Sequence, residues 1–270
     1  MYENKKNYPL MQLALCSLVS IAAWSSVSAA TLTNHYTFDN NLNDSVGSLN
    51  GSLGGGGNPF VAPGYVADAP VGADGGTTSI DFSDDGTHIS GFVLPLMPVS
   101  DAGSISLWMN ADVAQSGAYL FKFVELNLNL VQFNSALQFT LNGGVINNIP
   151  FTVEDWNLVT MTWDLQTGDA EVYLNGVLAG STTGIDDFDP GQTVTVNDSR
   201  FGVNHHIWGG VDQQFDGQFY DMQFYDGQLT AGEVATLFNS PGTTIPEPSA
   251  YALIGSAFVL TWVMLRRRRA

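Results

Sequence analysis

The chain has 270 residues, of which 44% are hydrophobic and 11% aromatic, and 26 acidic against eight basic residues give it a formal net charge of −18. The length and the aromatic content exclude a disordered chain, because there is enough apolar side chain for a core. The charge argues against nucleic acid as a partner, since a binder must neutralise phosphates with Lys and Arg. The single cysteine excludes an intrachain disulfide and a cysteine-based zinc site.

Residues 1–30 have the parts of a secretory signal peptide. Lys5-Lys6 gives a cationic start, Leu10–Trp24 is an apolar stretch, and Val27-Ser28-Ala29 supplies the small residues of a cleavage site. An uncleaved N-terminal anchor is the alternative. Cys16 follows a leucine rather than a small residue, so a lipoprotein signal is not expected.

Residues 241–270 form a linker followed by three ordered parts. Pro246-Glu247-Pro248 precedes an apolar run, Ala250–Leu265, and Arg266, Arg267, Arg268 and Arg269 stand just before the last residue. As a helix the run is roughly 24 Å long at ~1.5 Å per residue, which makes it a short single-pass membrane segment. Arginines on one flank indicate that the C-terminal end faces the cytoplasm.

This C-terminal arrangement resembles the PEP-CTERM sorting signal of Gram-negative bacteria, since Pro246-Glu247-Pro248, the apolar run and the arginines occur in that order and end the chain. The resemblance implies recognition by a membrane-embedded exosortase and removal of the helix. It also implies delivery to the cell envelope, outer surface or extracellular matrix. A plain tail anchor that stays in the membrane is the alternative.

Residues 31–240 read as one acidic, β-rich domain. Between positions 30 and 245, Lys122 and Arg200 are the only lysine and arginine residues against 24 acidic residues, so this part has a net charge of −22. Such a surface repels anions, favours solubility and concentrates cations. The simpler explanation of this charge is that it keeps the domain soluble. The more specific explanation is that a few of the carboxylates bind calcium.

Alternation of apolar residues predicts strands through most of the domain. Ser104–Met109 places Ile105, Leu107 and Met109 on one face, and Trp156–Leu165 alternates in the same way. Gln218–Tyr225 is the last expected strand. The residues expected on one face of it are Tyr220, Met222 and Phe224.

A hairpin and one short helix are the clearest local signals. Asn175-Gly176 joins Ala170–Leu174 to Val177–Ala179, and Asn-Gly favours a type I′ turn because both central residues need positive φ. Thr230–Phe238 is the only helical pattern in the domain, with Thr230 as its N-cap and Glu233 completing a capping box.

Many short strands with Gly, Asn and Asp turns predict an all-β, two-sheet antiparallel sandwich, most simply a jelly roll. Burial of large aromatic side chains would hold it together, each contributing roughly 1.5–3 kcal/mol before entropy is counted. The aromatic residues expected to be buried include Phe82, Trp108, Trp163, Phe201 and Phe219.

Several segments, taken in order, resemble a laminin-G-like, concanavalin A-like domain. Tyr36-Thr37-Phe38-Asp39 and the Asn-Asp-Ser segment at 43–45 look like its opening, and Ser104–Trp108 follows. The most diagnostic are Tyr173-Leu174-Asn175-Gly176 and the Asp-Gly-x-x-x-Asp segment at 216–221. The resemblance implies a jelly roll of two curved sheets whose terminal strands pair. Members of the family bind glycans, proteins or calcium, and many are non-catalytic modules.

Pairing of the terminal strands would bring oxygen donors from both ends of the domain together, and calcium requires several such donors. The candidate calcium ligands are Asp39, Asn41, Asp44, Asp216 and Asp221. An EF-hand is excluded, because Asp44 and Asn50 stand where it needs Gly and a bidentate Glu. The alternative is that these residues hydrogen-bond their own backbone in Asx turns.

Catalysis is not expected. Concanavalin A-like glucanases carry Glu-x-Asp-x-x-Glu on one strand, and two carboxylates are needed for the reaction. The nearest segment here begins at Glu125 but has Asn127 and Leu130 in place of the other two carboxylates. Adjacent pairs such as Glu154-Asp155 and His205-His206 point to opposite faces of a strand. A glycosidase or lyase without the usual motif is the alternative.

Glycan binding would use exposed aromatic side chains, with amide and acidic groups taking hydroxyls. Trp208, with His205 and Asn204 nearby, lies in a loop-like stretch and is the first candidate, while Tyr119 and Tyr65 are weaker ones. A Trp packed over a sheet edge is the simpler reading. The sequence thus predicts an exported surface or matrix module that binds or organises extracellular polysaccharide. A carbohydrate-active enzyme and a purely structural surface protein are the alternatives.

Overall fold

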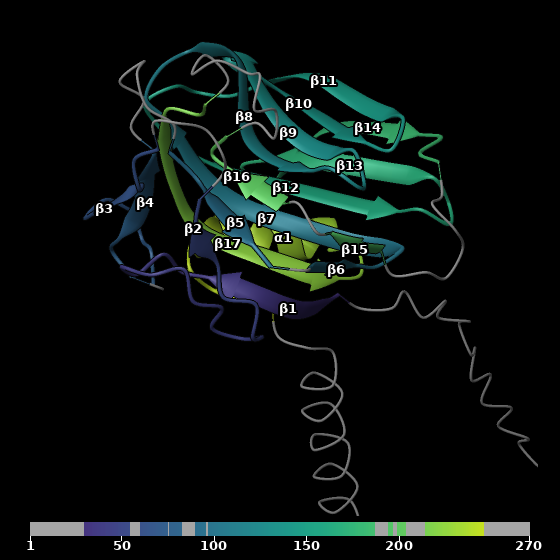
Figure 1. Cartoon of the computed structure of the whole chain (residues 1–270). Helices are drawn as coiled ribbons and strands as arrows, with labels where there is room; N and C mark the ends of the chain where they lie inside the picture. Colours follow the sequence, from purple (N-terminus) through teal and green to yellow (C-terminus); the bar gives the residue numbers. More distant parts are fainter. Residues whose placement is uncertain are drawn as a thin grey trace, which may run out of the picture.

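The computed structural model describes residues 30–54, 60–74, 76–82, 90–95, 97–186, 194–196, 199–203 and 214–245. The predicted signal peptide, the sorting signal and its apolar run lie outside these residues. Within them no helix has the length and the apolar composition that crossing a bilayer requires. The described part is a two-sheet antiparallel sandwich with one short helix, as predicted (Figure 1).

Sheet A contains both terminal strands of the sandwich. Its order is β14 (Val177–Thr183), β13 (Asp169–Leu174), β12 (Trp156–Asp164), β7 (Ala102–Ala111), β17 (Gly217–Asp226), β4 (Ser79–Phe82) and β3 (Gly64–Val66), and β1 (Thr31–Tyr36) pairs with β17. All its pairings are antiparallel, and Thr31 lies opposite Asp226 in the β1–β17 pair. The first and last strands of the domain are therefore neighbours, as expected.

Sheet B is built mostly from the middle of the chain. Its order is β11 (Gly144–Pro150), β10 (Ala136–Leu141), β9 (Leu128–Asn134), β8 (Gln115–Phe123), β16 (Ser199–Phe201), β5 (Phe92–Leu94) and β2 (Ser52–Leu53). A separate two-stranded ribbon joins β6 (Met97–Val99) to β15 (Val194–Val196).

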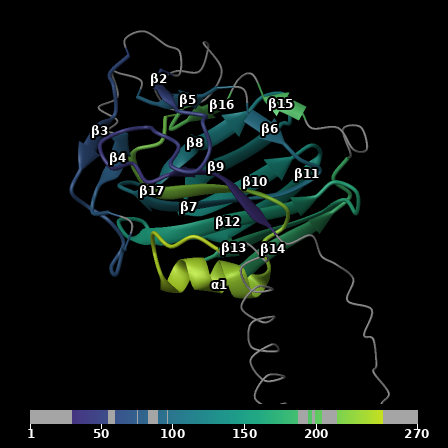
Figure 2. The same ribbon diagram turned by 90° about the horizontal axis from the view of Figure 1, so that it is seen from below.

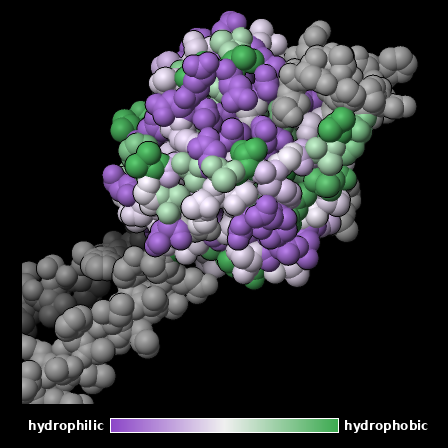
Figure 3. Space-filling view, turned by 90° about the vertical axis from the view of Figure 1, so that its left-hand side faces the viewer, coloured by the Kyte–Doolittle hydropathy of each residue, from purple (hydrophilic) through white to green (hydrophobic). Residues whose placement is uncertain are grey.

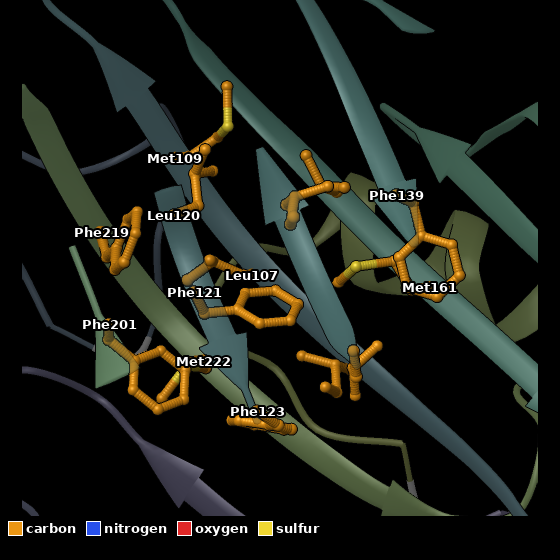
Figure 4. Packing of buried hydrophobic residues seen from close by; sticks show 14 of the residues in the cluster. Leu107, Met109, Leu120, Phe121, Phe123, Phe139, Met161, Phe201, Phe219 and Met222 are labelled. Atoms are coloured by element: carbon orange, nitrogen blue, oxygen red, sulfur yellow. The ribbon is translucent and has the colours of Figure 1, made fainter. Parts of the chain in front are cut away.

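The main core fills the space between the two sheets. Figure 4 shows Leu107 and Met109 of β7 with Phe121 and Phe123 of β8, and all four are essentially inaccessible to solvent. Phe201 stacks on Phe92 with ring centroids 4.7 Å apart. The predicted burial of Phe82, Trp163, Phe201 and Phe219 is confirmed. Strand alternation thus gives each sheet an apolar inner face, and burial of that face holds the layers together.

A second apolar cluster lies on the other side of sheet A, beneath α1 (Ala231–Asn239) (Figure 2). The capping box between Thr230 and Glu233 is confirmed. Val234 and Leu237 of the helix belong to this cluster, and so does Trp108 of β7. Trp108 is therefore buried, but against the helix rather than between the sheets, because it alternates with the inward-facing Leu107 and Met109.

One sequence-based assignment of faces is wrong. Tyr220 packs in the cluster beneath α1, whereas Met222 and Phe224 belong to the main core. The reason is Asp221, whose φ is +51° and at which the register of β17 against β7 shifts. An extra residue in a strand moves the side chains that precede it to the opposite face.

The predicted hairpin is confirmed. Asn175 and Gly176 have φ of +51° and +80°, which suits a type I′ turn between β13 and β14. The Asn175 Oδ1 also accepts a hydrogen bond from the backbone N–H of Leu158, at 2.9 Å. The turn residue therefore ties the hairpin to the neighbouring strand β12.

Candidate functional site

Asp44, one of the predicted calcium ligands, is a buried acceptor at the centre of a loop. Its two carboxylate oxygens accept hydrogen bonds from the backbone N–H groups of His35, Val46, Gly47 and Leu49 and from the side-chain amide of Asn34. Burial raises the pKa of Asp44, but these hydrogen bonds outweigh it and hold the pKa below its ordinary value. The carboxylate is thus occupied by the protein's own donors.

The glycine three residues later follows from the same arrangement. A Cβ at Gly47 would collide with the Asp44 carboxylate and lie 2.8 Å from the Asn34 Nδ2. Nothing larger than glycine fits there without opening the loop. The segment at 43–45, which resembles part of the opening of a family domain, therefore has a structural role: the hydrogen bonds of Asp44 hold the loop after β1 against β1 itself.

Asp221, another predicted ligand, is buried beside His35 of β1. The Nε2 of His35 lies 2.6 Å from the Asp221 Oδ1. The Asp221 carboxylate also accepts from the side chain of Gln223 and from the backbone N–H of Gly242. His35 donates its backbone N–H to Asp44, so one residue connects both carboxylates. These contacts join β1, β17 and the segment after α1.

Asp216 lies with other carboxylates rather than with Asp44 or Asp221. Burial raises the pKa of Asp81, and the charge of Asp216 raises it further. Burial and then the charges of Asp216, Asp81, Glu154 and Asp68 raise the pKa of Asp112. The side that carries β3 and β4 is mostly hydrophilic in Figure 3, with separated hydrophobic spots. Repulsion among these acidic residues costs stability at neutral pH.

Asp39 and Asn41 are both exposed and bonded within their own turn. The Asn41 side chain accepts from the backbone N–H of Asn43 and donates to the carbonyl of Asp39. The Asp39 carboxylate accepts from Asn40 and Thr78. The structure therefore does not bring the five predicted ligands into one site. In the part of the chain that it describes, no three His, Cys, Asp or Glu side chains are grouped so as to hold a metal.

The other predicted sites are placed only in part. Asn204, His205 and Trp208 lie outside the described residues. Glu125 is exposed in the turn between β8 and β9, so the segment compared with a glucanase motif begins in a hairpin turn and ends in β9 rather than lying on one strand. Tyr65 packs against the main core. Tyr119 lies half-buried on β8, with its side chain on the outer face of sheet B.

The outer face of sheet B, meaning the side chains directed away from sheet A, gathers both basic residues of the domain. Lys122 on β8 and Arg200 on β16 are directly opposite each other across the strand pair. Lys122 stands between the inward-facing Phe121 and Phe123, and Arg200 stands between the buried Ser199 and Phe201, so both point outward. The Lys122 Nζ lies 5.4 Å from the centroid of the Tyr119 ring, which places all three side chains on this face.

Polar and aromatic side chains continue from these bases across three further strands, β9, β10 and β11. Register places two rows on the face, one being Arg200, Lys122, Asn129, Thr140 and Val145, the other Tyr119, Val131 and Gln138. The Gln138 side chain donates to the Asn147 side chain, which completes the second row. Asn129 and Val131 are buried within these rows, so the face offers the polar side chains of Gln138, Thr140 and Asn147, the ring of Tyr119 and a cationic end.

Acidic residues are distributed unequally between the sheets. The strands of sheet A contain six: Asp81, Asp164, Asp169, Glu171, Asp221 and Asp226. The seven strands of sheet B, as described, contain none. The nearest acidic residue along the chain from Lys122 is Glu125, in the following turn. The strongly negative domain therefore has one sheet without carboxylates.

The sequence contains a signal for this face that residue-by-residue reasoning missed. From Leu126 to Val153 there is no charged residue, although the domain is strongly acidic. Lys122 stands just before this stretch. What the sequence does not give is the neighbour of Lys122, because Arg200 comes from a strand far along the chain.

A hollow lies on the α1 side of sheet A. Its volume is about 330 Å³, and its lining includes Trp108, Trp156, Phe238, Asp155 and Asn239. Trp156 is only partly buried and lies edge-on to Tyr220. This hollow therefore also places aromatic rings beside polar side chains.

Comparisons with known proteins agree with this architecture. A family model described as the concanavalin A-like lectin/glucanases superfamily matches residues 74–235. Domain 4 of AbnA, a GH43 extracellular arabinanase from Geobacillus stearothermophilus, was solved in complex with arabinotriose. It superposes with a TM-score of 0.60 and 24% identity, over 77% of this chain and 98% of that one. No curated protein matches.

Toxin binding domains have a similar fold. The binding domain of Paraclostridial Mosquitocidal Protein 1 has a TM-score of 0.58 and 16% identity, over 77% of this chain and 52% of that one. A structure of botulinum neurotoxin type C, whose cell entry depends on interaction with two ganglioside molecules, has a TM-score of 0.58 and 16% identity, over 78% and 51% of the two chains. This chain therefore spans about half the length of these toxin domains. At these identities the likeness shows the fold alone.

Proposed function

The chain belongs to the concanavalin A-like lectin/glucanases superfamily, and from this premise we propose that it is an exported, non-catalytic module that binds extracellular polysaccharide. The binding surface is the outer face of sheet B. Among proteins of similar fold, one was solved with arabinotriose and another interacts with gangliosides. These proteins of similar fold support a sugar as the class of ligand, and the side chains on the outer face of sheet B support that face as the binding surface.

The observation that carries the proposal is the composition of this face. A sugar offers hydroxyls for hydrogen bonds and an apolar ring face for stacking. The side-chain amide of Gln138 and the hydroxyl of Thr140 can bond sugar hydroxyls, and the half-buried ring of Tyr119 can contact the ring face of the sugar. The outer face of sheet A is less suited, because α1 covers much of it.

Retention on a polysaccharide array tests the proposal. The probe is the full-length chain in a mild detergent, beside Tyr119→Ala and the matched aromatic truncation Trp156→Ala in the hollow near α1. We expect Tyr119→Ala to weaken binding at least about tenfold, as truncation of a central aromatic contact does, and Trp156→Ala to retain it. Loss in Trp156→Ala alone would move the site to the α1 side. Retention of no glycan at all would favour a purely structural protein.

Absence of catalysis is part of the proposal. The segment nearest to a glucanase motif begins at Glu125 in the turn between β8 and β9 and continues into β9, and Asn127 and Leu130 replace its other carboxylates. A retaining or inverting glycosidase needs two carboxyl groups facing one substrate. Reducing-end and lyase assays on every polysaccharide that the array retains are expected to show no product. Release of sugar that depends on a carboxylate of this chain would establish an enzyme instead.

Export and sorting complete the proposal. The signal peptide at residues 1–30 directs secretion. An exosortase acts at Pro246-Glu247-Pro248, so the apolar run and the arginines at 266–269 anchor the protein in the membrane only until they are removed. Mass spectrometry of the exported protein is expected to find the C-terminus near the Pro-Glu-Pro segment. An exported protein that keeps its arginine tail would replace this with a permanent tail anchor.

A further inference from the structure

We infer that Phe133 of β9 is a second sugar-stacking residue on the outer face of sheet B, and that the polysaccharide bound there is uncharged. This inference rests on the proposed function and names the chemical class of its ligand. The first observation behind it is the exposure of Phe133. This side chain is 42% exposed, whereas every other phenylalanine in the strands that the structure describes is at most 5% exposed.

The register of sheet B places the Phe133 ring on the proposed binding surface. Leu130 of β9 packs in the main core, and no register shift interrupts the pairing of β9 with β10. Side chains alternate along a regular strand, so Phe133, three residues after Leu130, points to the outer face. Its cross-strand partners are Ser116 on β8 and Ala136 on β10. Both have small side chains, which leaves the ring accessible from the two neighbouring strands.

Phe133 and Tyr119 form a pair of rings on this surface. Tyr119 lies directly opposite Val131, two residues before Phe133, so the two aromatic residues are diagonal neighbours across β8 and β9. Diagonal neighbours have Cβ atoms about 7–8 Å apart, which aromatic side chains can span. Phenylalanine has no polar atom to keep in water, so its exposure forgoes the free energy that burial would give. A sugar whose apolar ring face covers Phe133 recovers that free energy.

Polar groups stand beside the two rings. Gln138 on β10 is also opposite Val131, which makes it a diagonal neighbour of Phe133. Its side-chain amide donates to the side chain of Asn147 on β11, and this bond fixes its direction. A primary amide has two N–H groups and an acceptor oxygen, so one hydrogen bond uses only part of the capacity of either amide. Sugar hydroxyls at the edge of a ring stacked on Phe133 therefore find partners.

The lack of charge around Phe133 indicates the class of sugar. No charged residue occurs from Leu126 to Val153, and strands β9, β10 and β11 all lie within this stretch. An acidic group of a ligand placed over these strands would lose water without gaining a counter-charge. Lys122 lies on the neighbouring strand β8, where its Nζ is 5.4 Å from the centroid of the Tyr119 ring. The 24 acidic residues of the domain also repel anions, so an uncharged polysaccharide fits this surface best.

Variants of Phe133 test the stacking contact on each polysaccharide that the array retains, with the full-length chain in mild detergent. We expect Phe133→Ala to weaken binding at least about tenfold and Phe133→Tyr, which keeps a flat ring, to retain it. Phe133→Leu keeps apolar area without the ring and should lose most of the binding. The matched control is Phe60→Ala, since Phe60 is 37% exposed but lies between β2 and β3. It should bind like the natural chain.

The melting temperature shows that these losses are not unfolding. Because Phe133 is exposed, its three variants should melt within about 2 °C of the natural chain. Binding by Phe133→Ala that equals binding by the natural chain would overturn the inference. If Tyr119→Ala still loses binding in that case, the proposed function stands without Phe133.

Pairs of polymers that share a backbone test the charge of the ligand. Methyl-esterified polygalacturonate is compared with polygalacturonate, and hydroxyethyl cellulose with carboxymethyl cellulose. The uncharged member of a retained pair should bind at least about tenfold more tightly, and the glycans retained on the whole array should be uncharged. Tighter binding of an acidic member, or retention of acidic glycans alone, would overturn the inference and leave the proposed function intact. Retention of no glycan of any kind would instead remove the proposed function.

Discussion

The two sheets of this sandwich share a core but use their other faces differently. The outer face of sheet A is packed beneath α1, with Trp108, Tyr220 and Leu237 buried there, and its strands contain six carboxylates. The outer face of sheet B has no described helix over it, no carboxylate in its described strands, and both basic residues of the domain.

This difference between the outer faces assigns folding stability mainly to sheet A and ligand binding to sheet B. An apolar face that is covered contributes to folding and is closed to ligands, whereas a polar face that stays open contributes little to folding and can bind. Substitutions on sheet A should therefore change stability, and substitutions on the outer face of sheet B should change binding. The four predictions below follow this contrast, from the largest expected effect to the smallest.

Truncation beneath the helix should have the largest effect. Trp108→Ala removes a side chain that is 4% exposed and stacks on Phe238, so we expect a loss of about 3–5 kcal/mol in unfolding free energy. The matched substitution on sheet B, Thr140→Ala, is half-buried on the outer face and should stay within about 0.5 kcal/mol. Urea unfolding of both variants measures this. Similar losses for the two would end the contrast between the faces.

Loss of the Asp44 carboxylate should cost somewhat less, about 3 kcal/mol, because Asp44→Ala leaves one buried and several partly buried N–H groups without their acceptor. Asp44→Asn keeps one acceptor oxygen and should lose less. The pKa of Asp44 is lowered in the folded state, so its contribution is present above the unfolded pKa and is lost as pH falls through the folded value. The difference between natural chain and Asp44→Ala should therefore shrink in acid. A constant difference down to the lowest pH would contradict this role.

Removal of one charge at the β3–β4 side should stabilise slightly. Burial and the charge of Asp216 raise the pKa of Asp81 in the folded protein. Protonated Asp81 therefore contributes its whole stabilising free energy below the ordinary Asp value of 3.8, and this contribution is lost as the pH rises through the pKa of the folded state. At neutral pH we expect Asp81→Asn to raise the Tm by about 1–2 °C. The charge-matched control, Asp226→Asn, is exposed and should change the Tm less. A lower Tm for Asp81→Asn would show that its carboxylate is needed.

Calcium removal should have the smallest effect. Binding at Asp39 and Asn41 stays a prediction, and these exposed groups supply few ligands, so any affinity is weak. Calcium at its own Kd would stabilise by RT ln 2, about 0.4 kcal/mol, which is about 1 °C in Tm for a domain of this size. Thermal melts with calcium and with a chelator measure it. A drop of many degrees would reveal a strong site.

Much of the fold could be predicted from local sequence, because local physics decides it. Alternation gave strands β7, β12 and β17 to within a residue or two, Asn175-Gly176 gave the hairpin, and Thr230 with Glu233 gave the start of α1. Each of these signals lies within a few neighbouring residues, so the sequence alone contains it.

The candidate site was harder to predict. Acidic residues suggested calcium ligands, but whether a carboxylate is free for a metal depends on which donors fold against it. Asp44 and Asp221 are occupied by backbone and side-chain groups that the sequence does not place beside them. The register shift at Asp221, which moves Tyr220 to the helix side, likewise depends on how β17 pairs with β7.

By itself, the amino-acid sequence determined that this protein is an acidic two-sheet sandwich with one capped helix, because periodicity, turns and caps act over short stretches of chain. Only the tertiary structure decided that Lys122 and Arg200 meet on one face of sheet B, and that the other sheet is closed by α1. The reason is that strands far apart in the sequence pair with each other. Hydrogen bonds between strands, and not distance along the chain, determine which side chains become neighbours.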